Sequence, residues 1–124
     1  MTINTKFDAL LAIDAIADKL IKKKINFKNH GVSEIKIMHD SVVGWNGTGP
    51  APRFAAALAA DRGITELAAK ARIITLYETT VAVFETSIEL ELPARKEIKA
   101  LANPTPAQLK AVYDKHEALF MSEW

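Results

Sequence analysis

Apolar positions follow a helical period along the longest uninterrupted stretch of the chain, residues 64–92. This stretch contains no Gly, Pro, Asn or Asp and lies between Gly63 and Pro93. Its apolar residues recur at steps of three and four, the spacing of one face of an α-helix. The pattern predicts one long central helix, about 40 Å at 1.5 Å per residue. The residues of this apolar stripe are Ile64, Leu67, Ala71, Ile74, Tyr77, Val81, Phe84, Ile88 and Leu92.

The second half of the same stretch also fits a β-strand. From Thr80 to Leu92 apolar and polar residues alternate, and several of them are β-branched, which favours strands. If residues 80–92 formed a strand, the fold would be α+β. No turn residue marks a switch from helix to strand near Thr79, so the pattern favours a single helix.

Two elements are predicted within the first 40 residues. Residues 4–24 have an apolar face at helical spacing, with Asn4 or Thr5 as the cap, and predict an amphipathic helix. That face comprises Phe7, Leu10, Ile13, Ala17, Leu20 and Ile21. Residues 33–39 alternate between apolar and polar and predict a short, minor strand.

Three more helices are expected around the central one. An alanine-rich segment that begins at Pro52 predicts a helix, which Gly63 would end. Pro93 would start a short helix over residues 94–102. The last helix begins at Thr105, where the spacing to Gln108 is that of a capping box.

These elements predict a mainly α fold, a compact bundle of four to five helices around residues 64–92 with the minor strand 33–39. The length of 124 residues predicts a single domain, 1–124. The chain has no cysteine, so disulfides and thiolate chemistry are excluded. No apolar run is long enough for a membrane span, no signal peptide is evident, and a cytoplasmic location is expected.

The charge balance argues against nucleic acid as the general partner. Sixteen basic and fifteen acidic residues give a net charge of +1, whereas phosphate binding normally requires a basic excess. Residues 51–72 do place a short helix, a glycine turn and a second helix in succession, as in a degenerate helix-turn-helix motif. DNA binding through this segment is therefore kept as an alternative function.

The glycine-rich loop of residues 44–53 suggests a second alternative, the binding of a small ligand or nucleotide. Trp45 could stack on a base, Asn46 and Thr48 could hydrogen-bond it, and Arg53 could neutralise an anion. Pro50 and Pro52 lack the amide donors of a phosphate-binding loop, and the lysine of a P-loop is missing. An ordered surface loop is the simpler interpretation.

Other polar residues do not combine into a recognisable site. His39–Asp40 fits a polar pair at the end of a strand, and His116 fits a histidine at the rim of the core. Glu85 and Glu89, one turn apart, fit a solvated acidic stripe. We therefore predict no catalytic residues, no metal and no cofactor.

Three apolar residues, Leu76, Val83 and Leu90, lie outside the main stripe of the central helix. One small chain cannot readily cover so much apolar helix surface, which suggests an interface. The sequence thus favours a small non-enzymatic interaction protein, an adaptor, assembly or inhibitor module. Its expected partner is another protein, itself as a homo-oligomer, or both.

Overall fold

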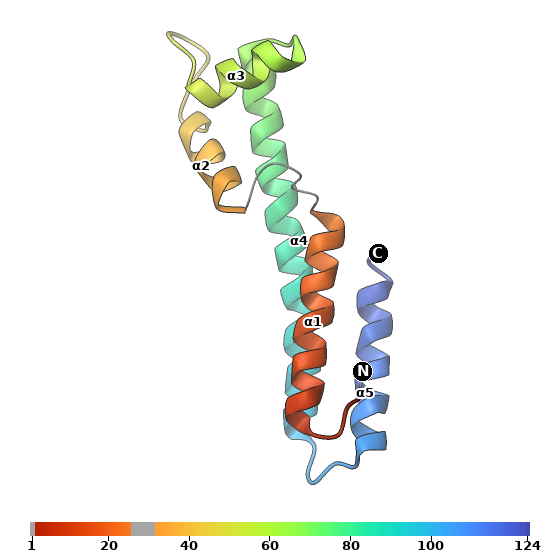
Figure 1. The fold of residues 1–124 in the computed structure, drawn as a ribbon. Helices are drawn as coiled ribbons and strands as arrows, with labels where there is room; N and C mark the ends of the chain where they lie inside the picture. Colours follow the sequence, from red (N-terminus) through yellow and green to blue (C-terminus); the bar gives the residue numbers. More distant parts are fainter. Residues whose placement is uncertain (1, 26–31) are drawn as a thin grey trace. The chain divides into compact units, whose positions relative to one another are not determined.

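The computed structural model describes residues 2–25 and 32–124, and this part of the chain folds into five helices without a strand (Figure 1). The mainly α prediction with a long central helix is confirmed. Within the described ranges, no helix combines the length and apolarity needed to cross a membrane. The helices are α1 (Lys6–Lys24), α2 (Val32–Val42), α3 (Arg53–Arg62), α4 (Glu66–Ala100) and α5 (Pro106–Met121).

Capping boxes define where α1 and α5 begin. The Thr5 hydroxyl accepts the amide of Asp8, whose carboxylate accepts the amides of Thr5 and Asn4. The Thr105 and Gln108 side chains exchange the same pair of bonds with each other's backbone. Both caps satisfy amides that the first turn of a helix leaves without partners. The predicted starts of these two helices are therefore confirmed.

The central helix α4 is longer than predicted because it continues through Pro93. The separate helix predicted over residues 94–102 is wrong, and so is the alternative strand over 80–92. β-branched Thr80 fits the helix because its hydroxyl donates to the Leu76 carbonyl within the same helix. Beyond Pro93, Ala94 and Ile98 are fully buried. Their packing offsets the hydrogen bond that proline cannot donate.

The minor strand predicted over residues 33–39 is wrong, because this segment lies in α2. Ile35 and Val42 are buried and Met38 packs against a core cluster, which is the i, i+3, i+7 spacing of a helix. Ile37, which a strand would place beside Ile35, is exposed. The predicted strand depended on the alternation of only two isoleucines. The burial of Ile35 and Val42 and the packing of Met38, at helical spacing, favour the helix instead.

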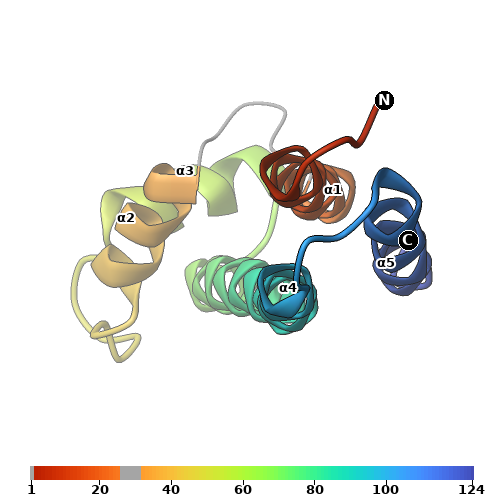
Figure 2. The same cartoon turned by 90° about the horizontal axis from the view of Figure 1, so that it is seen from below.

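The described structure contains two compact units, and each is treated by itself below. Unit 1 comprises Met1–Asn26 and Val83–Trp124, and unit 2 comprises Phe27–Ala82. Unit 1 contains α1, α5 and the second half of α4, which Figure 2 shows end on at the corners of a triangle. Alanines on α1 let these helices approach closely. The buried core residues are Ile3, Ala9, Ala12, Ile13, Ile16, Ala17, Leu20, Ala94, Ile98, Leu109, Tyr113 and Phe120.

Polar contacts fix the direction of the helices in unit 1. The Lys6 ammonium donates to the Lys99 carbonyl at 3.1 Å, and the buried Ser87 hydroxyl donates to the Ala17 carbonyl at 3.3 Å. The start of α1 therefore lies beside the end of α4, and the two helices run antiparallel.

Unit 2 is formed by α2, α3 and the first part of α4, around the buried residues Val42, Ala55, Ala59, Ala69 and Ile73. Gly63 ends α3 in the left-handed conformation, with φ of 65°. The Thr65 hydroxyl then accepts the Ala68 amide at the start of α4. The predicted glycine stop is confirmed, and it turns the chain between the two helices.

Gly47 and Gly49 offer a matched test of how the loop packs in unit 2. Both have positive φ, but a Cβ on Gly47 would lie 2.8 Å from a Leu67 methyl group, whereas a Cβ on Gly49 would meet nothing. We expect Gly49→Ala to lower the free energy of unfolding by about 1 kcal/mol through backbone strain. Gly47→Ala should cost more than this, by up to about 1 kcal/mol, because the exposed end of the Leu67 side chain must move aside. Urea unfolding of both variants measures the difference, and equal costs would contradict the Leu67 contact.

Candidate interaction surface

The predicted ligand loop uses most of its polar groups internally. The Trp45 indole donates to the Thr48 carbonyl at 3.0 Å, and the Asn46 carboxamide accepts both the amide and the hydroxyl of Thr48. The Lys70 ammonium donates to the Trp45 carbonyl, and Arg53 is exposed at the start of α3. A ligand would have to displace the bonds that shape the loop, and ligand binding there stays a prediction.

The segment predicted to resemble a helix-turn-helix does place two helices on either side of Gly63. The second of them, α4, spans 35 residues. Of its two early basic side chains, Lys70 is already engaged with the loop, and Arg72 is exposed. DNA binding through residues 51–72 also stays a prediction.

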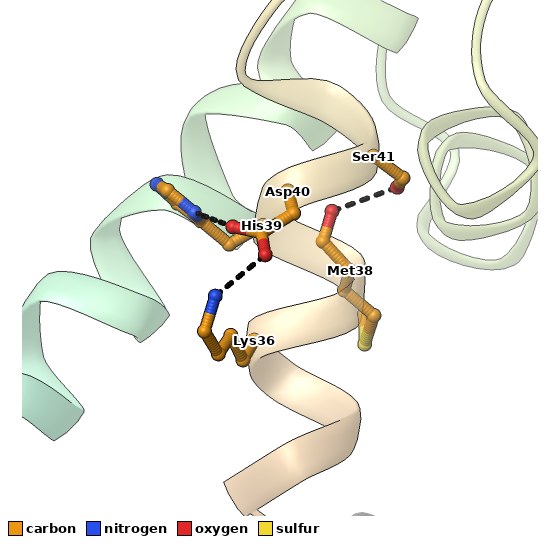
Figure 3. Close-up of polar contacts among 5 residues, drawn as sticks. All are labelled: Lys36, Met38, His39, Asp40 and Ser41. Carbon is orange, nitrogen blue, oxygen red and sulfur yellow. Dashed lines mark hydrogen bonds and ion pairs between the residues drawn. The ribbon is translucent and has the colours of Figure 1, made fainter.

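His39 and Asp40 lie on one side of α2 and contact each other (Figure 3). The imidazole Nδ1 lies 3.0 Å from the Asp40 carboxylate, and the ring stacks on Tyr77 at 3.9 Å between centroids. The Lys36 ammonium, which donates to Asp40, and then His39 hold the pKa of that carboxyl below its usual value. Ser41 points to the other side of the helix (Figure 3). The pair is therefore a packing contact of α2 rather than part of a serine triad.

His116 is a buried residue that joins α5 to α4. Its Nε2 lies 2.5 Å from the Glu97 carboxylate, which also accepts from the Lys115 ammonium. The hydrogen bonds from Lys115 and then His116 lower the pKa of Glu97. This geometry agrees with the interpretation of His116 as a histidine at the rim of the core.

The acidic residues of α4 considered as candidate metal ligands lie at its surface. Glu85 and Glu89 are both exposed. Among the described residues, no group of three or more His, Asp or Glu side chains is placed to hold a metal ion. The contacts in this part of the chain thus supply no evidence for metal chemistry.

An open hollow of about 220 Å³ lies on unit 2. Its lining is apolar apart from two arginines, Arg62 on α3 and Arg72 on α4. We call it the arginine hollow; its lining residues are Met38, Leu58, Arg62, Arg72, Ile73 and Leu76. The Arg62 guanidinium already lies 3.5 Å from the Asp61 carboxylate, so Arg72 is the main cation that the hollow offers to an anion with a hydrocarbon group.

The three residues predicted as an interface do not share one surface within one unit. Leu76 belongs to unit 2, where it is exposed and lines the arginine hollow. Val83 and Leu90 belong to unit 1, where both are half-buried and Leu90 packs against the core. Their role in binding a partner stays a prediction.

The largest exposed apolar side chains of α1 and the second half of α4 form one pair on each helix. Phe7 and Leu11 on α1 are 67% and 50% exposed, and Ile88 and Leu92 on α4 are 49% and 60% exposed. Each pair is spaced by one helical turn, so its members lie on the same side of their helix. Full burial of such a side chain stabilises a protein by about 1.5–3 kcal/mol. Because these side chains are about half exposed, roughly half of that stabilisation would be gained only if a partner covered them.

Charged residues continue both stripes with the same spacing. On α1 the next positions are Asp14 and Asp18, and on α4 they are Arg95 and Lys99. Each stripe therefore has two apolar residues followed by two charges, acidic on α1 and basic on α4. We call these eight positions the open face: Phe7, Leu11, Asp14, Asp18, Ile88, Leu92, Arg95 and Lys99.

An ion pair at the centre of the open face joins its two stripes. The Arg95 guanidinium donates to the Asp14 carboxylate at 2.5 Å. On α4, one turn before Arg95, burial and then a hydrogen bond with Asp14 raise the pKa of Glu91. The two stripes therefore lie on neighbouring sides of α1 and α4 and form a continuous surface.

Glu91 predicts a pH-dependent stability. The pKa of Glu91 is higher in the folded state than its ordinary value of 4.5. Glu91 therefore contributes its full stabilisation at pH values below 4.5, and this contribution is lost as the pH rises through the pKa of the folded state. We expect Glu91→Gln to be more stable than the wild type at pH 7, and this advantage to shrink towards pH 4. Thermal unfolding across that range measures it. If Glu91→Gln were less stable than the wild type at pH 7, the burial of the Glu91 carboxylate beside Asp14 could not be what raises its pKa.

Sequence reasoning placed Phe7, Ile88 and Leu92 on the inward stripes of their helices. A broad apolar stripe does not by itself show which of its edges a neighbouring helix covers. One signal was available: Asp14 lies seven residues after Phe7, and so on the same side of α1. An acidic residue in that register indicates the solvent side.

The chain was also compared with known proteins. No family model, no curated protein and no solved structure matches it. The geometry of its own surfaces is therefore the basis for assigning a function.

Proposed function

We propose that the protein is a non-enzymatic interaction module that binds a protein partner through the open face. The observation that carries this proposal is the presence of four large exposed apolar side chains, one pair on each of two adjacent helices. Exposed apolar patches larger than a few hundred Å² on soluble proteins often mark interaction sites. Two histidines that could serve in catalysis, His39 and His116, instead pair with Asp40 and Glu97 in contacts within the fold.

A photo-cross-linking amino acid at position 92 tests the proposal in the native host. We expect one discrete cross-linked product, because Leu92 would lie against a partner. The same group at Ala111, an exposed position of α5, serves as the matched control and should give no such product. Leu11→Gln should abolish the product at position 92. The proposal fails if position 92 gives no discrete product, or if the product persists in the Leu11→Gln protein.

A second candidate function is the binding of an amphiphilic anion in the arginine hollow. Its support is the combination of an apolar lining with Arg62 and Arg72. Decanoate is a suitable probe, with decanol as the neutral control of the same chain length. We expect decanoate to shift the NMR signals of Met38 and Ile73, and Arg72→Gln to weaken its binding at least 5-fold. Equal binding of decanol would contradict a site for anions.

A further inference from the structure

The open face has its apolar and charged residues arranged on opposite diagonals. Because α1 and α4 run antiparallel, Phe7 and Leu11 lie at the same height as the basic half of the α4 stripe. Asp14 and Asp18 lie at the same height as Ile88 and Leu92. The contacts Lys6–Lys99 and Ala17–Ser87, at the two ends of the face, establish these heights. One diagonal of the face is therefore apolar. The other joins an acidic corner, formed by Asp14 and Asp18, to a basic corner, formed by Arg95 and Lys99, and we call it the charged diagonal.

This diagonal pattern is self-complementary for one two-fold arrangement. With a two-fold axis along the apolar diagonal, the Phe7–Leu11 pair of one chain contacts the Phe7–Leu11 pair of the second chain. The Ile88–Leu92 pairs of the two chains contact each other in the same way. The same rotation places the acidic corner of one copy on the basic corner of the other. We propose that the partner of the open face is a second copy of the chain, related by this diagonal two-fold axis. The inference rests on the function proposed above.

The other three ways of pairing two open faces lack this match. With a two-fold axis along the charged diagonal, each acidic or basic corner would lie on its own copy, and the like charges would repel. With a two-fold axis parallel to the helices, the acidic corner would cover Ile88 and Leu92 of the second copy. With an axis across the helices, it would cover Phe7 and Leu11. The arrangements with an axis parallel to the helices or across them bury carboxylates against apolar side chains. The free energy needed to desolvate these carboxylates exceeds what the contact contributes. The diagonal arrangement makes the helices of the two copies cross steeply, a rarer but known class of helix packing.

The size of the open face sets the expected strength of this dimer. Stable interfaces typically use about 20–30 residues a side. The open face provides eight positions, so we expect dissociation in the micromolar range. A net charge of +1 adds little repulsion between copies. The dimer is therefore expected to be reversible and dependent on concentration.

A charge-swap experiment tests both the partner and the arrangement. Asp18→Lys places a lysine opposite Lys99 of the second copy, and Lys99→Glu places a glutamate opposite Asp18. We expect each variant alone to dimerise at least 10-fold more weakly than the wild type in sedimentation experiments. A one-to-one mixture should recover affinity to within about 3-fold, because each new charge then meets its opposite. A mixture as weak as the separate variants would overturn the diagonal arrangement.

Single-cysteine variants give an independent test, since the chain contains no cysteine of its own. In the diagonal arrangement, Leu11→Cys and Leu92→Cys should each form disulfide-linked dimers with themselves. Asp18→Cys should cross-link to Lys99→Cys but not to itself. Cross-linking of Leu11→Cys only to Leu92→Cys would instead show a two-fold axis along the charged diagonal, and would overturn the proposal.

The inference can fail while the proposed function stands. A wild-type chain that remains a monomer at millimolar concentration would overturn the second copy as the partner. A discrete product at position 92 that contains another protein would then support the interaction function alone. If position 92 also gives no product, both proposals fail.

Discussion

Replacing Phe120 by alanine is expected to lower the free energy of unfolding by about 3–5 kcal/mol. Phe120 is fully buried near the end of α5, within the core of unit 1. Alanine there removes the apolar contacts of the ring and leaves a cavity, because the surrounding helices relax only in part. The total stability of a small domain is about 5–15 kcal/mol, so this loss would leave the protein close to unfolding.

Phe7→Ala is the matched control, because it makes the same chemical change on an exposed position of α1. Its effect on unfolding should stay within about 0.5 kcal/mol when the protein is dilute enough to be monomeric. Chemical denaturation at a protein concentration well below the dissociation constant of the dimer measures both variants. Comparable losses for Phe7 and Phe120 would contradict the exposure of Phe7 and with it the open face.

Replacing Pro93 by alanine is expected to raise the free energy of unfolding by about 2 kcal/mol. Within α4, Pro93 cannot donate to the carbonyl four residues before it, and its ring clashes with that carbonyl, at a cost of about 3 kcal/mol. The greater freedom of alanine in the unfolded chain returns about 0.4–1 kcal/mol of that difference. The net effect should remain stabilising, which is unusual for a single substitution.

Pro106→Ala provides the comparison for Pro93. Pro106 occupies the first position of α5, where no hydrogen bond is lost and the fixed φ of proline suits the helix. We expect this variant to be slightly destabilised, by less than about 1 kcal/mol, so the two substitutions should have opposite signs. If Pro93→Ala were destabilising by a similar amount, α4 would have to end at Pro93, as the sequence pattern indicated.

The helices themselves were largely predictable from local signals. The capping residues Thr5 and Thr105 and the stop at Gly63 act on their own neighbours, so the sequence alone identifies them. The continuation of α4 past Pro93 was not predictable in this way. It depends on the burial of Ala94 and Ile98 against other helices, a tertiary effect that outweighs a local breaker.

The open face was harder to predict than the helices. The apolar stripes of α1 and α4 are broader than the area that three packed helices cover, and the sequence does not show which edge stays exposed. Leu90 and Leu92 illustrate this point on one helix. Leu90 lay outside the predicted stripe and packs against the core, whereas Leu92 lay within it and is exposed. The packing of the other helices of unit 1 against α4 determines which of them is available to a partner.

Sedimentation equilibrium of the wild type beside Leu11→Gln/Leu92→Gln tests most directly whether the open face is an interface between copies. For the wild type, we predict an average mass that rises with concentration from 13.6 kDa towards twice that value. The double variant should remain at the mass of one chain while keeping its helical circular dichroism. The same rise in mass for both proteins, or no rise for the wild type up to millimolar concentration, would contradict this account of self-association.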